Sequence, residues 1–219
     1  MPYTNNKYVV AAICGNFYQE STVNPGVWEN LSVGQPGFGL GQWTDNNEVS
    51  RRTDLFNYLD NHGYSRNSGE GQLEFLIVEN VWNVYGANHQ NSLYHNLTEF
   101  LNSSSIDIDF LTDEFMYHWE GINDGTNATR RAFANDVLLM IDNDPGTRQP
   151  WTSGNFYCTR QQALDNSMLI YDFLMNTVPP EPPEPPEPPE PHEPTEEEII
   201  SVFRYLLNKR GIEGVHIII

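Results

Sequence analysis

"AICGNFYQESTVNPG", residues 12–26, decides how the first part of this chain folds. Apolar side chains recur within and just before this stretch at helical spacing, which predicts a helix over residues 7–20. Pro25 and Gly26 break the pattern and indicate a turn. Glu20 therefore lies at the C-terminal end of the predicted helix.

Glu20 occupies an unfavourable position for an anion, because the helix dipole is negative at its C-terminal end. Phe17, Tyr18 and Trp28 lie close to it in the sequence, so desolvation should raise the pKa of its carboxyl group. A glutamic acid that keeps its proton near neutral pH suits the general acid of a glycosidase. The other interpretation of a single Glu here is an ordinary solvated side chain.

The rest of the chain predicts an α+β fold that is mostly helical. The Gly-rich stretch "SVGQPGFGLGQWT", residues 32–44, is typical of a tight β-hairpin or a looped strand pair. Helical periodicity then returns in six stretches, at residues 48–63, 70–86, 92–103, 107–121, 127–142 and 159–176.

The composition divides the chain into three parts. Residues 1–178 form the predicted domain. Residues 179–194 repeat the triplet Pro-Pro-Glu, which favours extended polyproline II and predicts a semi-rigid spacer. Residues 195–219 predict a short helical segment, too short to bury a core of its own. This segment docks on the main domain, joins an oligomer or begins a longer polypeptide.

The charge excludes several classes of partner. The formal net charge is −19, and the spacer with the adjoining "TEEE" holds only 8 of the 30 acidic residues. A chain this acidic is not expected to bind nucleic acid, and it gains no attraction to anionic membranes or wall polymers. No apolar run approaches the roughly 20 residues of a membrane span. The N-terminus lacks the features of a signal peptide.

The two cysteines do not form a disulfide framework. Cys14 lies in an apolar run and is expected to be a small buried residue, although a bridge to Cys158 stays open. The histidines lack metal-ligand spacing, so neither a metal nor another cofactor is expected.

Three motifs resemble the phage tail lysozyme family, lysozyme-like peptidoglycan-cleaving domains of bacteriophage tail and virion proteins. "AAICGNFYQESTVNPGVWENL" at 11–31 and "GFGLGQWT" at 37–44 match the family's helix, turn and Gly-rich segment in order and spacing. "EFMYHWEGINDGTNATRRAFANDVLLM" at 114–140 is similar to its closing "YERPxDxTxxxR" segment. The resemblance covers about residues 7–141 and implies a lysozyme-like domain.

The resemblance implies Glu20 as the catalytic acid. It also places Gln42, Trp43 and Thr44 on the β side of the cleft, as expected contacts for the substrate. Asp45 follows directly and is the favoured second carboxylate across the cleft.

Two other carboxylates and two other aromatic residues lie in segments that could contribute to the site. Glu29 and Glu120 are expected to be hydrogen-bonded structural groups or plain surface. Tyr18 and Trp28 are candidates to stack on sugar rings, as is Trp43. Core packing is an equally good interpretation of Trp28 and Trp43.

The family usually begins with a helix of the pattern "YLTxxQAxxNAxxIYxYL", which this chain lacks before residue 7. A similar segment appears instead at 156–176, "FYCTRQQALDNSMLIYDFLMN". Either the domain is circularly permuted, with the helix at 155–176 in the place of the first, or a second module begins there. Permutation is favoured, because the helix at 7–20 would otherwise expose an apolar face.

These observations predict a muramidase-type glycoside hydrolase that cleaves peptidoglycan glycan strands, as a tail- or virion-associated lysin or an endolysin. The expected location is the phage tail or the host cell wall. Other tail proteins are candidate partners through residues 195–219. The alternatives are a lytic transglycosylase and a non-catalytic structural or glycan-binding module.

Overall fold

The computed structural model of the protein describes residues 2–29, 36–46, 49–85 and 91–176. The predicted spacer at 179–194 and the C-terminal segment at 195–219 lie outside the described residues, as does part of the predicted hairpin, 30–35.

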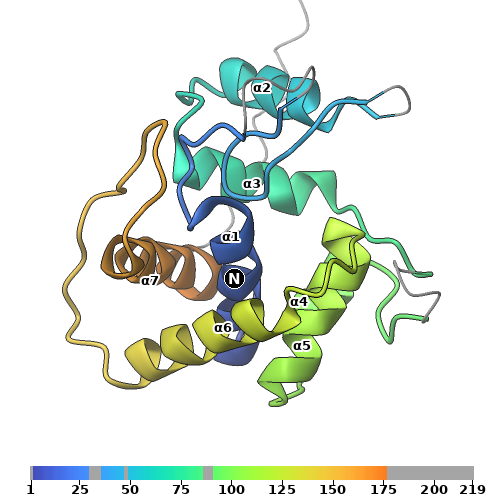
Figure 1. The fold of residues 1–219 in the computed structure, drawn as a ribbon, viewed down its shortest axis with the longest axis vertical. Helices are drawn as coiled ribbons and strands as arrows, with labels where there is room; N and C mark the ends of the chain where they lie inside the picture. Colours follow the sequence, from blue (N-terminus) through green and yellow to red (C-terminus); the bar gives the residue numbers. More distant parts are fainter. Residues whose placement is uncertain (1, 30–35, 47–48, 86–90, 177–219) are drawn as a thin grey trace, which may run out of the picture. The chain divides into compact units, whose positions relative to one another are not determined.

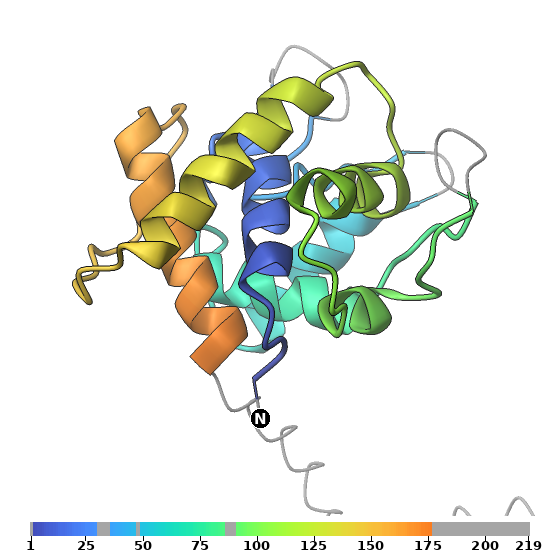
Figure 2. The same cartoon turned by 90° about the horizontal axis from the view of Figure 1, so that it is seen from below.

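The described part of the chain is mostly helical, as predicted. Its helices are α1 (Lys7–Ser21), α2 (Arg51–Asn61), α3 (Gly69–Glu79), α4 (Leu97–Leu101), α5 (Ile108–Phe115), η1 (Met116–Glu120), α6 (Asn127–Asp142) and α7 (Arg160–Asn176). Helix α1 packs against α5, α6 and α7, while α2 packs against α3 (Figure 1). The view from below shows α7 on one side of α1 and α5 on the other, with α6 crossing α1 (Figure 2).

Helix α1 is the centre of the core. All residues from 9 to 17 are buried, as expected of a helix that is covered on every side. The Asn6 side chain caps its start by accepting a 3.0 Å hydrogen bond from the backbone N–H of Tyr8. A Cβ atom at Gly15 would collide with the backbone carbonyl of Arg130, so this glycine allows α6 to cross α1 closely.

The Gly-rich segment does not form the predicted hairpin of paired strands in its described part. Its β pairing consists of isolated antiparallel bridges, in which Phe38 pairs with Trp43 and with Trp28. Phe38 and Trp43 exchange two backbone hydrogen bonds of 3.1 Å. Gly39 and Gln42 lie between them with positive φ angles of 77° and 46°, so the chain reverses tightly between the two bridged residues.

Helix α7 covers α1, as the permuted arrangement requires. The Cys14 thiol lies 4.0 Å from the backbone carbonyl oxygen of Ser167. At the other end of α7, the backbone N–H groups of Tyr3 and Thr4 donate to the carbonyl oxygen of Leu174 at 3.0 and 3.1 Å. The segment therefore completes the core around α1, and the permutation itself stays a prediction.

Cys14 and Cys158 are both unpaired buried thiols, so the disulfide left open by the sequence is not formed. Burial raises the pKa of the Cys14 thiol to about 12. Across the described ranges, none of the helices has both the length and the apolar character needed to cross a membrane.

Candidate active site

A cleft of about 450 Å³ opens at the C-terminal end of α1. Its walls come from α1, the bridge segment, the start of α2, the end of η1 and the loop before α7. The lining residues are Gln19, Glu20, Glu29, Gly41, Gln42, Thr44, Asn46, Val49, Arg51, Glu120, Ile122 and Tyr157. A second groove of about 540 Å³, beside the start of α1, has no carboxylate in its lining. The chemistry therefore points to the smaller cleft.

Glu20 is held by a buried guanidinium group. Arg130 on α6 donates from Nη2 to Glu20 Oε1 at 2.5 Å, and its side chain is 0% exposed. The same guanidinium donates to Asn16 Oδ1 and to Thr126 Oγ1, each at 3.0 Å. Glu20 keeps 19% of its side-chain surface exposed, so it remains accessible from the cleft.

Burial raises the pKa of Glu20, in the direction expected from the sequence. The positive charge of Arg130 and its hydrogen bond oppose this shift, while the negative charges of Asp124 and Glu29 add to it. The carboxyl group thus combines a fixed position with a raised proton affinity, the two properties required of a general acid.

Glu120 lines the same cleft, although the sequence favoured a structural or surface role for it. It ends η1, a turn of π-helix that continues α5, and Gly121 follows with a φ of 73°. Burial raises the pKa of Glu120 well above its usual range, and the nearby charge of Glu20 raises it further. Its Oε1 atom is buried and has no hydrogen-bond partner within the described ranges.

The free energy of unfolding of the Glu120→Gln variant, relative to that of the wild type, is expected to increase as the pH rises. A carboxyl with a raised pKa binds more protons in the folded chain, so it destabilises the fold above its unfolded pKa of about 4.3. Gln does not titrate, so the variant does not lose stability in this way as the pH rises. Urea unfolding of both proteins between about pH 5 and pH 7 measures the difference.

Glu99→Gln provides a control of opposite sign. Hydrogen bonds from the backbone and the side chain of His95 lower the pKa of Glu99, so its carboxylate contributes stability that is lost as the pH falls. The stability of Glu99→Gln relative to the wild type should therefore fall as the pH rises towards about 4.3 and stay level between about pH 5 and pH 7. A Glu120→Gln variant that behaves like this control would contradict the raised pKa of Glu120.

Asp45 is not among the residues that line the cleft. Its Oδ2 accepts a 2.8 Å hydrogen bond from Arg52, and its Oδ1 accepts one of 3.0 Å from the backbone N–H of Thr53. Burial alone would raise the pKa of Asp45, but the bonds from Thr53 and Arg52 outweigh it and lower the pKa. The carboxylate therefore caps the first turn of α2, which differs from the catalytic position expected from the sequence.

The aromatic residues predicted to contact sugars face elsewhere. Trp43 is 1% exposed and donates from Nε1 to Glu79 at 3.2 Å, so it packs in the core. Tyr18 stacks on Phe133 with ring centroids 3.9 Å apart. Neither these two rings nor Trp28 lines the cleft.

Trp28 packs on Phe38 and Phe56, with ring centroids 4.7 and 5.9 Å apart. Gln42 and Thr44 do line the cleft, as expected. Gln42 donates from Nε2 to the carbonyl oxygen of Gly39 at 2.8 Å, which fixes its side chain at the wall.

Arg51, Arg130 and Tyr157 were not among the residues predicted for the site. Arg51 forms a two-point ion pair with Glu79 and lies 4.8 Å from the centre of the Trp119 ring. Adjacent arginines in a helix are usually exposed, so helical periodicity did not indicate that Arg130 is buried. Its one signal was the match of Thr126 and Arg130 to the "TxxxR" end of the family pattern.

Comparisons with known proteins show what this chain is similar to. The sequence profile of the family described as phage tail lysozyme matches residues 4–141. Morphogenesis protein 1 of Bacillus phage B103 is 32% identical over 107 residues, or 48% of this chain. The matched part makes up 28% of that relative's own length. The family match includes Glu20, Glu120 and Arg130 and ends before Tyr157.

Proposed function

Because this chain belongs to the phage tail lysozyme family, we propose that it hydrolyses the glycan strands of bacterial peptidoglycan, as a muramidase. The observation that carries the proposal is the Glu20 carboxyl, buried at the cleft, fixed by Arg130 and raised in pKa. A positioned carboxylic acid with a raised pKa is what protonation of a glycosidic oxygen requires.

In the proposed reaction Glu20 donates its proton to the glycosidic oxygen as the bond from that oxygen to the anomeric carbon breaks. Water then adds to the anomeric carbon, and its proton leaves so that Glu20 is protonated again. The products are a new reducing end and a free hydroxyl group on the leaving sugar.

Glu120 supports the acid role of Glu20. Two carboxyl groups that share a site with one guanidinium cannot both ionise easily, and this mutual effect raises the proton affinity of the pair. Gln42 and Thr44 line the same cleft and offer polar groups that can orient the sugar.

A lytic transglycosylase is the second candidate. The observation in its favour is the position of Asp45 outside the cleft. The carboxylate predicted across the cleft is engaged by Arg52 and Thr53 instead. In a transglycosylase one acid is sufficient, because a hydroxyl group of the substrate itself attacks the anomeric carbon.

Mass analysis of the products released from purified peptidoglycan tests the proposal. Reducing ends are expected from a hydrolase, whereas 1,6-anhydro ends would identify a transglycosylase. Binding to peptidoglycan without any released product would instead indicate a non-catalytic glycan-binding or structural module.

We further propose that the domain acts at the host cell wall as part of a phage tail or virion. The support is the family and a relative named as a morphogenesis protein. The net charge of −19 suits delivery by a particle better than electrostatic attraction to an anionic wall. In this proposal residues 195–219 provide a contact with other tail proteins.

We also propose that α7 takes the place of the family's first helix. It lies outside the family match at 4–141 and packs on α1, where its residue Ser167 lies beside Cys14.

A further inference from the structure

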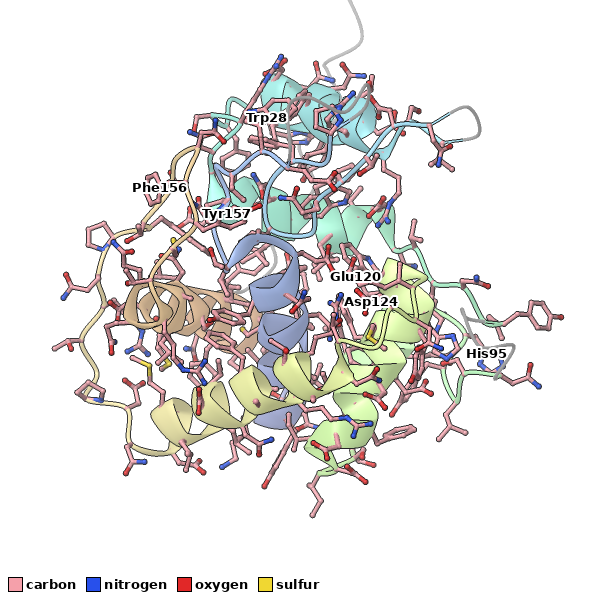
Figure 3. The ribbon with its side chains drawn as sticks, viewed as in Figure 1. Trp28, His95, Glu120, Asp124, Phe156 and Tyr157 are labelled. Carbon is pink, nitrogen blue, oxygen red and sulfur yellow. The ribbon has the colours of Figure 1, made fainter. Side chains whose placement is uncertain are left out.

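The loop between α6 and α7 brings an exposed aromatic ring to the cleft. Tyr157 is 65% exposed and nevertheless lines the cleft together with Glu20 and Glu120. Figure 3 shows Phe156 and Tyr157 of this loop, in a part of the chain that follows the family match at 4–141. Tyr157 is the one aromatic side chain among the described residues that line the cleft.

The loop is attached to the segment that directly follows Glu20. The Asn24 side chain donates from Nδ2 to the carbonyl oxygen of Gly154 at 3.0 Å and accepts from the Gly154 N–H at 3.2 Å. The backbone N–H of Cys158 donates to Thr22 Oγ1 at 2.7 Å. These bonds flank Tyr157 on both sides and fix its backbone relative to Glu20.

Close packing strengthens this attachment. The backbone N–H of Trp28 donates to Asn155 Oδ1 at 3.2 Å. A Cβ atom at Gly26 would collide with the backbone nitrogen of Gly154, so the two segments touch through their main chains. Tyr157 therefore extends from a fixed backbone, although its ring is free of the core.

We propose that Tyr157 is an aromatic platform on which one sugar ring of the glycan chain stacks. A tyrosine ring has an apolar face for the C–H groups of a sugar and a hydroxyl group for its polar edge. The remaining lining of the cleft is mostly polar and charged, and the other predicted rings pack elsewhere. This inference rests on the proposed action on peptidoglycan glycan strands, and it adds a specificity-determining residue.

Binding of soluble peptidoglycan oligosaccharides to the Glu20→Gln protein tests the platform without cleavage of the ligand. Adding Tyr157→Ala should weaken binding by about three- to tenfold, as expected for the loss of one stacked ring. Tyr157→Phe keeps the ring and should stay within about twofold. Tyr157→Leu keeps apolar bulk without a ring and should bind as weakly as the Ala variant.

Tyr85→Ala is the matched control, because Tyr85 is 72% exposed and does not line the cleft. Its binding should equal that of the Glu20→Gln parent. Equal binding by the Ala, Leu and parent proteins would overturn the platform, and so would a parent that binds no oligosaccharide. The role of Glu20 is judged separately, by whether Glu20→Gln retains cleavage, so the two proposals fail independently.

Discussion

Glu20→Gln is expected to lower the rate of glycan-strand cleavage by about 10²- to 10⁴-fold while the protein remains folded. The amide has the shape of the carboxyl group but no acidic proton to give to the glycosidic oxygen. Its oxygen can still accept the hydrogen bond from Arg130, so the buried guanidinium keeps a partner. The rate is measured as release of reducing ends from purified peptidoglycan.

Asp45→Asn is the informative comparison for Glu20→Gln. Its carboxylate caps α2 and is not part of the cleft lining, so activity should stay within about tenfold of the wild type after correction for folded protein. A Glu20→Gln variant as active as the wild type would remove Glu20 from the acid role. An Asp45→Asn loss as large as that of Glu20→Gln would return Asp45 to the mechanism.

Arg130→Met is expected to destabilise the fold by about 1–3 kcal/mol for each acceptor that loses its buried donor, Glu20 Oε1 and Asn16 Oδ1. The substitution removes the partner of Glu20 and also the donor to Asn16 Oδ1, which is itself buried. The free energy of unfolding, measured in urea at neutral pH, gives the size of the effect.

Arg131, the next residue on α6, is the control, because it also forms an ion pair but is more exposed than Arg130. Arg131 pairs with Asp113, but its side chain is 36% exposed. Arg131→Met should therefore cost less than about 1 kcal/mol. Similar losses for the two variants would show that the buried position of Arg130 contributes nothing special to stability.

Most helices followed from local patterns in the sequence, although α3 ends at Glu79 and not at 86, and α4 covers only Leu97–Leu101 of the helix predicted at 92–103. In α2, for example, Leu55 and Leu59 recur one turn apart and both are buried. The end of α1 could also be predicted from nearby residues, because Pro25 and Gly26 follow Glu20 within a few positions. These features require no knowledge of distant parts of the chain.

The partners of Glu20 depend on long-range packing and could not be predicted in the same way. Arg130 is buried because α6 crosses α1 closely at Gly15, 115 positions earlier in the chain. Glu120 reaches the cleft through a π-helical turn, which has no strong local sequence signature. Both residues lay within the segment that resembles the family, but their contacts required the fold.

Aromatic residues were the least predictable part of the site. Trp43 and Tyr157 are both large rings outside the helices, yet one is buried in the core and the other is exposed. In an irregular segment, tertiary contacts decide whether a side chain points into the core or into solvent. The hydrogen bonds from Asn24 that place the Tyr157 loop join residues 130 positions apart.

The backbone contact of Tyr3 and Thr4 with Leu174 brings both ends of the folded body to one point (Figure 2). Polypeptide attached at the two ends would therefore leave the domain from the same place, and the domain would not be stretched between two distant attachment points. Tension along that polypeptide would load this junction first. The cleft lies at the other end of α1, about 22 Å away for a helix of 15 residues, and would bear none of the strain.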